Sequence, residues 1–184
     1  MRLSLGLPFT RWQNAVDWAS WNGHVDVLDW WRDSGLELKY SEYAMDWAGV
    51  NGHINALQWW LDSGLELKYS DWAMNGASCN GDVDVLEWWR SSGLKLEYSE
   101  FAMDGASDLD ALQWWLDSGL ELKYTDEAMD EASANDHIDV LQWWLDSGLE
   151  LKYSEIATNK ASNNGHIDVL NWWRDSVTIQ TSHI

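Results

Sequence analysis

Six pairs of adjacent tryptophans divide the chain at nearly equal intervals. The pairs are Trp30-Trp31, Trp59-Trp60, Trp88-Trp89, Trp114-Trp115, Trp143-Trp144 and Trp172-Trp173. Successive pairs are separated by 29, 29, 26, 29 and 29 residues. A fixed period in this range is typical of stacked repeats, in which each unit buries its apolar face against its neighbours. The sequence therefore predicts six units in a single domain, 1–184. Their boundaries fall at about 11–40, 41–69, 70–98, 99–124, 125–153 and 154–184.

The first part of each unit is predicted to be a helix. In the second unit, Ser41 followed by Glu42 marks its start, because a hydroxyl caps free amides and an acid suits the positive end of the helix dipole. Ala44 and Ala48 are four residues apart and so share one face. Small side chains on that face would allow another helix to approach closely.

A second helix and an extended arm complete the unit. The Asn-Gly-His turn at 51–53 ends the first helix, and the second helix starts near Ile54 and carries the tryptophan pair. Gly64 is a helix stop of the left-handed kind. The alternating segment 65–69, Leu-Glu-Leu-Lys-Tyr, predicts an extended arm that runs along the stack.

The segment from Ala48 to Gly64 resembles the second half of an ankyrin repeat, in which a Gly-His turn precedes an apolar helix that ends in glycine. The likeness recurs in the six units and covers nearly the whole chain. The Thr-Pro-Leu-His opening of the family is absent, the tryptophan pair replaces aliphatic residues, and the period is four residues shorter than the usual 33. The resemblance implies an all-α, ankyrin-like α-solenoid of six helix-turn-helix repeats joined by extended arms. The missing residues lie where ankyrin repeats carry β-hairpin fingers, so we expect no full fingers.

The fourth unit and the two ends depart from the pattern. The fourth unit lacks three residues at the turn, where Asp108 and Leu109 replace the Gly-His bend, so we expect a change of curvature there. The segment 5–10 is similar to an arm, and 177–182 reads as a degraded arm without its glycine. Degenerate terminal copies of this kind are typical caps of repeat stacks.

The formal net charge is −20, which disfavours nucleic acid and anionic lipid as partners and favours basic ones. The alternative is that the charge only keeps a tryptophan-rich protein in solution. Cys79 is the only cysteine, so an internal disulfide is excluded and a reducing compartment fits best. No apolar run reaches the length of a membrane span, and the first ten residues are too short for a secretory signal. We therefore expect a cytoplasmic protein.

No pattern of residues indicates catalysis, a cofactor or a metal ion. The turn histidines come one per unit, and neighbouring units lie about 8–10 Å apart, so they do not converge on one ion. They are His24, His53, His137 and His166. The chain has no glycine-rich phosphate loop and no Ser/His/Asp set. We interpret the paired tryptophans as core, and the alternative is a light-absorbing or electron-carrying array.

Three positions of the first helix vary between units while the others hardly change. They are Asn14, Tyr43, Trp72, Phe101, Glu127 and Ile156; Trp18, Trp47, Gly76, Gly105, Glu131 and Lys160; and Trp21, Val50, Cys79, Ala134 and Asn163. Because these positions fall at i, i+4 and i+7, they share one face. That face lies well over 90° from the paired alanines, since each residue turns a helix by about 100°. It is therefore expected to face solvent.

The N-terminal half of this face is the candidate binding site. Its aromatic residues are Trp18, Trp21, Tyr43, Trp47, Trp72 and Phe101, and the acids Asp46 and Asp104 run beside them, in a row with Asp17 and Asp130. Aromatic rings among carboxylates suit a peptide that carries Lys or Arg. The alternative is that large side chains close gaps between wide repeats. The sequence favours a monomeric scaffold that binds a basic protein or peptide, and the competing hypothesis is a structural protein that assembles end to end.

The third arm exchanges the charges of its neighbours, with Lys95 and Glu97 in place of an acid followed by a lysine. If the arms stack in register, Lys95 would lie between Glu66 and Glu121. The sequence therefore predicts ion pairs between neighbouring arms, each worth about 0–1 kcal/mol.

Overall fold

The computed structural model describes residues 15–181, with side chains as far as Ser176. These residues form twelve α-helices and no strand, so the all-α prediction is confirmed. The helices are α1 Ala15–Trp21, α2 Val25–Asp33, α3 Tyr43–Val50, α4 Ile54–Asp62, α5 Trp72–Cys79, α6 Val83–Ser91, α7 Phe101–Asp104, α8 Leu109–Asp117, α9 Glu127–Ala134, α10 Ile138–Asp146, α11 Glu155–Asn164 and α12 Ile167–Thr181. The segment 5–10 lies outside the described residues.

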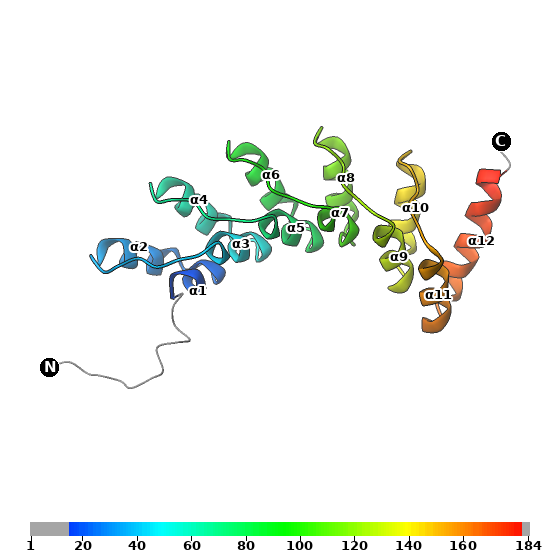
Figure 1. Cartoon of the computed structure of the whole chain (residues 1–184), viewed down its shortest axis with the longest axis horizontal. Helices are drawn as coiled ribbons and strands as arrows, with labels where there is room; N and C mark the ends of the chain where they lie inside the picture. Colours follow the sequence, from blue (N-terminus) through cyan, green and yellow to red (C-terminus); the bar gives the residue numbers. More distant parts are fainter. Residues whose placement is uncertain (1–14, 182–184) are drawn as a thin grey trace.

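The helices form two rows. The odd-numbered helices follow one another in one row and the even-numbered helices in the other, while extended segments lead from each even helix to the next odd one (Figure 1). Successive odd helices pack directly on each other, and each odd helix other than α7 also packs on the even helix that follows it. The order of the units along the chain is therefore their order in space.

The turn between the two helices of a unit has a residue of positive φ in five units, which is a glycine in four of them and Asp136, with φ of +64°, in the fifth unit. At the second unit the backbone of Gly52 has φ of +73°, in the left-handed region that disfavours side chains. The amide of His53 then donates to the carbonyl of Ala48 at 2.8 Å, which closes α3. In the preceding unit Gly23 has φ of +66°, and a Cβ there would lie 2.8 Å from Nδ1 of His53. Gly23 is thus fixed both by its backbone and by the histidine of the next unit.

The core is made of the paired alanines and the tryptophans. Ala44 and Ala48 are fully buried between neighbouring odd helices. The second tryptophan of five pairs is buried, namely Trp60, Trp89, Trp115, Trp144 and Trp173. The interpretation of the pairs as core is confirmed for these residues. Trp30 of the first unit differs, because 59% of its surface is exposed.

Three of the buried indoles donate a hydrogen bond to the preceding unit. Nε1 of Trp60 donates to Oγ of Ser20 at 2.8 Å, and the same bond joins Trp115 to Ser78 and Trp173 to Ser133. The indole nitrogens of Trp89 and Trp144 are buried without a hydrogen-bond partner. For Trp89 the reason is that Gly49 stands where the other units have this serine. For Trp144 it is that Ser107 lies beyond the end of α7 and is exposed.

The arms pack on the second helices and on one another. The ring of Tyr40 lies 4.6 Å from that of Trp60, and its hydroxyl donates to the carbonyl of Glu66 in the next arm at 2.8 Å. Nζ of Lys68 lies 4.8 Å from the centre of the Tyr40 ring. Each arm therefore covers the tyrosine of the arm before it.

The predicted ion pairs between neighbouring arms are wrong. Nζ of Lys95 lies 2.5 Å from Oε1 of Glu97 in its own arm, and the described residues show no ion pair of Lys95 with Glu66 or Glu121. Lys68 likewise pairs with Glu66 of its own arm, at 3.9 Å. The reason is that residues i and i+2 of an extended segment point to the same side, so the nearest opposite charge is two residues away.

The fourth unit is the irregular one, as predicted. Its first helix, α7, has four residues, whereas α3, α5 and α9 have eight. The carboxylate of Asp108 caps α8 by accepting from the amides of Asp110 and Ala111 at 2.9 and 3.2 Å. The row of helices turns between α7 and α9 (Figure 1). A cavity of about 250 Å³ lies at this junction, lined by both helices.

The expected degraded arm after the last unit is also wrong. Helix α12 continues through it to Thr181. In the fifth unit, Gly148 ends the corresponding segment with φ of +75°. Val177 stands at that place in the sixth unit. A β-branched residue does not adopt this backbone conformation readily, so the helix runs on.

Candidate aromatic binding site

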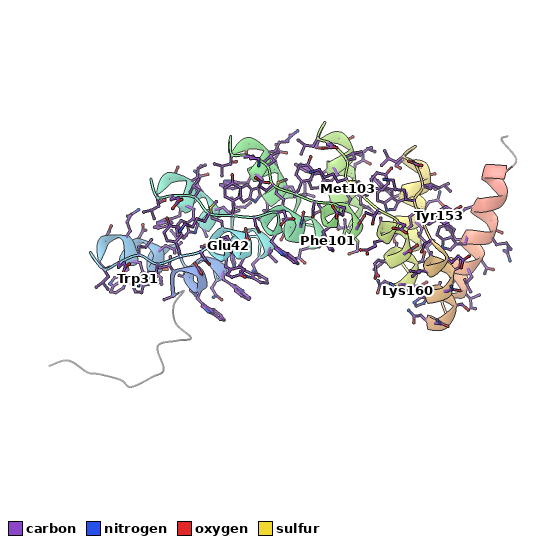
Figure 2. All side chains as sticks on the ribbon, viewed as in Figure 1. Trp31, Glu42, Phe101, Met103, Tyr153 and Lys160 are labelled. Atoms are coloured by element: carbon purple, nitrogen blue, oxygen red, sulfur yellow. The ribbon has the colours of Figure 1, made fainter. Side chains whose placement is uncertain are left out.

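The variable aromatic residues of the first helices are on the surface. Exposed fractions run from 51% for Tyr43 to 62% for Trp72, with Trp18 and Phe101 between them. Trp21 and Trp47 are half-buried. These six residues, Trp18, Trp21, Tyr43, Trp47, Trp72 and Phe101, are called the aromatic face below. Figure 2 shows the side chains that project from the row of odd-numbered helices, with Phe101 labelled among them.

Three indoles of the aromatic face form a continuous stack. The rings of Trp18 and Trp21 are 5.2 Å apart and inclined by 7°. The rings of Trp21 and Trp47 are 4.3 Å apart and inclined by 13°. Stacked indoles lose little conformational freedom on binding and present a large apolar surface. The sequence placed these tryptophans on one face but did not show that they stack between α1 and α3.

A small pocket adjoins this stack between α3 and α5. It is lined by Tyr43, Asp46, Trp47, Val50 and Trp72, and its volume is about 80 Å³. The close approach of the two helices depends on Gly76, because a Cβ there would lie 2.3 Å from Cγ2 of Val50.

Asp46 and Asp104 do not belong to an exposed acidic border. Asp46 is 2% exposed, and its two carboxylate oxygens accept from the amide and the hydroxyl of Ser70 at 2.7 and 2.6 Å. Asp104 holds Thr125 in the same way, at 2.8 and 2.7 Å. Ser70 in turn accepts from the amide of Trp72 at 3.2 Å and so caps α5. The expectation for these two acids was wrong, because each is turned toward the first helix of the next unit.

Other acids border the aromatic face instead. Glu42, Asp71 and Glu100 directly precede its residues Tyr43, Trp72 and Phe101. Glu42 and Glu100 are exposed, and Asp71 is half-buried. The sequences of α1, α3, α5 and α7 contain no Lys, Arg or His. From the sequence alone, Glu42, Asp71 and Glu100 are explained only as a match to the helix dipole. Their position before each first helix also places these acids beside the aromatic face.

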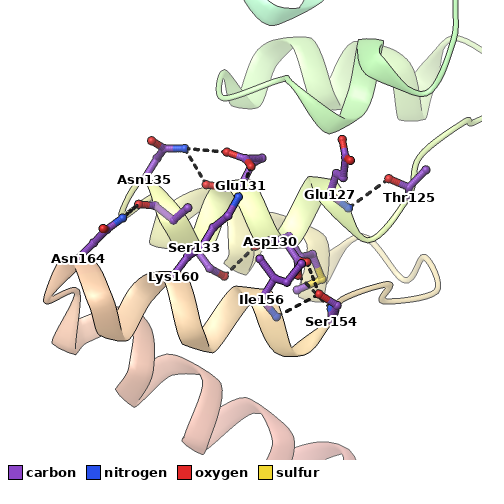
Figure 3. A network of polar contacts seen from close by, with 12 residues as sticks. Thr125, Glu127, Asp130, Glu131, Ser133, Asn135, Ser154, Ile156, Lys160 and Asn164 are labelled. Atoms are coloured by element: carbon purple, nitrogen blue, oxygen red, sulfur yellow. Dashed lines mark hydrogen bonds and ion pairs between the residues drawn. The ribbon is translucent and has the colours of Figure 1, made fainter.

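The C-terminal half of the same row is occupied by its own polar contacts. Nζ of Lys160 pairs with Oε1 of Glu131 at 2.5 Å, and Nδ2 of Asn164 donates to the carbonyl of Ala134 at 2.9 Å. Figure 3 shows this network between α9 and α11. The aromatic and polar halves of the row therefore differ in chemistry, as the sequence predicted.

The part of the chain that the structure describes has neither a metal site nor a membrane-spanning helix. No group of three or more His, Cys, Asp or Glu residues there could hold a metal ion. No helix between residues 15 and 181 is long and apolar enough to cross a membrane. Burial raises the pKa of the Cys79 thiol, which lowers its thiolate fraction at neutral pH.

The buried carboxylates should make the protein more stable in mild acid. Burial raises the pKa values of Asp17, Asp46 and Asp104, although their hydrogen bonds to the next unit oppose the shift. A raised pKa in the folded state means that the folded chain binds the proton more tightly. This contribution is fully present below the pKa of the unfolded chain and is lost as pH rises through the folded pKa.

We therefore expect the thermal midpoint to rise as pH falls from neutral toward 3.8, the ordinary pKa of an aspartate, at constant ionic strength. Each proton taken up on folding makes the free energy of unfolding change with pH by about 1.36 kcal/mol per pH unit. The thermal midpoint of the variant Asp46→Asn should depend less on pH than that of the unmodified chain. A midpoint that falls over this range would contradict the assignment.

No protein-family model matches this chain, and a search of curated proteins finds no match either.

Proposed function

We propose that this chain is an ankyrin-like α-solenoid and that it acts as an interaction scaffold, binding a basic protein segment on its aromatic face. The architecture is supported by two-helix units that follow one another in two rows, four of them with a turn glycine of positive φ. Scaffolds of this kind offer one continuous surface rather than a deep cleft. That surface here is the row of odd-numbered helices.

The observation that carries the proposal is the exposure of large aromatic side chains beside acids. Trp18, Tyr43, Trp72 and Phe101 are each more than half exposed, although burial would favour the fold. Tryptophan and tyrosine dominate the energetics of many protein interfaces. The flanking carboxylates and the net charge of −20 attract a cationic segment, and cation–π contacts hold it on the rings.

Calorimetry with synthetic peptides tests the proposal. A peptide of four lysines spaced by Gly-Ser should bind, its affinity should fall with added salt, and the same peptide with glutamates should not bind. Trp72→Ala and Phe101→Ala should each weaken binding by roughly tenfold, since each removes an exposed contact. Trp47 is a poor choice for this test, because it is stacked on Trp21 and supports the fold.

Two variants serve as matched controls for the peptide experiment. Trp30→Ala removes an equally exposed tryptophan from the other row of helices. Ile156→Ala truncates the residue of the sixth unit that is equivalent to Phe101. Both should bind the basic peptide as the unmodified chain does. Equal loss in all four variants, or equal binding of the acidic peptide, would contradict the proposal. A molar mass that grows with concentration in light scattering would favour the competing hypothesis of end-to-end assembly.

A further inference from the structure

The pocket between α3 and α5 has three aromatic walls. Tyr43 and Trp47 lie four residues apart on α3 and so share one face, and Trp72 is the first residue of α5. Val50 lies one turn further along the same face of α3 and completes the lining. Tyr43 and Trp72 are exposed, so the pocket can be entered from the aromatic face.

The pocket is lined by a carboxylate whose oxygens are not exposed to accept a hydrogen bond from a ligand. Asp46 lines it, but this residue is 2% exposed and both carboxylate oxygens already accept from Ser70. A primary ammonium has three N–H donors that need acceptors, and burying them unpaired is costly. A quaternary ammonium has no donor and spreads its charge over methyl groups. The lining of this pocket therefore suits the methylated form of the cation better.

The size of the pocket agrees with a small, compact head group. Its volume of about 80 Å³ corresponds to only a few heavy atoms, since a water molecule in the liquid takes up about 30 Å³. A trimethylammonium head has four heavy atoms, and its alkyl chain can leave through the open side. Aromatic cages are the usual means by which proteins bind such cations.

The pocket is absent from the two neighbouring junctions of the row that the structure describes. Between α1 and α3, Trp21 stands where Val50 stands in α3, and its ring stacks on Trp47. Between α5 and α7, three of the four lining positions of α3, those of Asp46, Trp47 and Val50, are replaced by Asn75, Gly76 and Cys79. One junction is thus filled by an indole, and the other has neither the tryptophan wall nor the carboxylate.

We propose that the pocket lined by Tyr43, Asp46, Trp47, Val50 and Trp72 binds the trimethylammonium head of a methylated lysine in the basic partner. The inference rests on the proposed function for the peptide that carries this lysine. One head group binds per chain, and the rest of the peptide lies along the stacked indoles toward Trp18. The neighbouring acids Glu42 and Asp71 attract the flanking basic residues.

Three peptides that differ only at the tip of one side chain test the inference. They are the basic peptide with one central lysine unmodified, the same lysine trimethylated, and a neutral isostere in which carbon replaces the quaternary nitrogen. Calorimetry should give one site per chain and an affinity for the trimethylated peptide at least roughly tenfold above that for the other two. Tetramethylammonium chloride alone should shift the indole N–H resonance of Trp72 in NMR spectra.

Variants separate the pocket from the rest of the face. Trp72→Ala and Tyr43→Ala should remove the preference for the trimethylated peptide, because both remove a wall of the pocket from an exposed position. Phe101→Ala lies outside the pocket. It should lower the affinity for all three peptides by the same factor and keep the preference for the trimethylated peptide. Ile156→Ala should change nothing.

The outcomes distinguish the two proposals. Binding of the basic peptides without a preference for the methylated one would overturn the pocket assignment and leave the scaffold function standing. A preference for the neutral isostere would show an apolar pocket and also overturn it. If none of the peptides binds but tetramethylammonium still shifts Trp72, the pocket is right and the proposed peptide surface is wrong. If neither the peptides nor tetramethylammonium bind, both proposals fail.

Discussion

Replacing Trp60 with alanine should lower the free energy of unfolding by about 3–5 kcal/mol, the range for large aromatic residues removed from a packed core. Trp60 is fully buried, its ring packs against Tyr40 of the arm, and its Nε1 donates to Ser20 of the preceding unit. The substitution leaves a cavity and removes one of the two hydrogen bonds of Ser20, whose hydroxyl still donates to the carbonyl of Ala44 at 2.6 Å. Urea unfolding followed by circular dichroism measures the loss.

Trp30→Ala is the matched control for this experiment. Trp30 lies on the corresponding second helix of the first unit, in the other half of the tryptophan pair, and is 59% exposed. Its removal should change the stability by less than about 0.5 kcal/mol, as is usual for surface substitutions. Equal losses in the two variants would show that the buried indole is not what holds the units together.

The variant Asp46→Ala should be the next most damaging, with a loss of about 2–3 kcal/mol. It removes the acceptor for both the amide and the hydroxyl of Ser70, and it loosens the cap of α5. Thermal unfolding compared between the variant and the unmodified chain gives the loss.

Asp46→Asn should cost less than about 1 kcal/mol, because the chain already uses an amide at the equivalent place. Oδ1 of Asn75 accepts from the amide of Ser99 at 3.1 Å, and its Nδ2 donates to the Ser99 hydroxyl at 2.8 Å. An Asn variant as unstable as the Ala variant would mean that the charge, and not the pair of hydrogen bonds, joins the two units.

Local features of the fold could be predicted from the sequence because they depend on neighbouring residues. Ser70 caps its helix by accepting from an amide two residues later, and Gly64 ends a helix with φ of +71°. The alanine spacing predicted a buried face, and Ala44 and Ala48 are fully buried. The repeat also located the fourth unit as the irregular one, since three residues are nearly a full helical turn.

Features that depend on the neighbouring unit could not be predicted in this way. Asp46 directly precedes Trp47, yet one reaches Ser70 of the next unit while the other stacks on Trp21 of the preceding unit. Neither contact follows from spacing within one repeat. The pocket beside Trp72 likewise exists only because α3 and α5 approach closely at Gly76. The position of a residue in the repeat predicted its helix face but not its partner.

The short helix α7 has a consequence for how the chain unfolds. Cooperativity in a linear array is transmitted only through the interface between adjacent units. At the α7–α9 junction that interface has a four-residue helix, a cavity and an indole of Trp144 without its serine partner. The coupling free energy is therefore smallest there. We therefore expect the chain to unfold as two cooperative blocks, units one to four and units five and six, with the aromatic face entirely within the larger block.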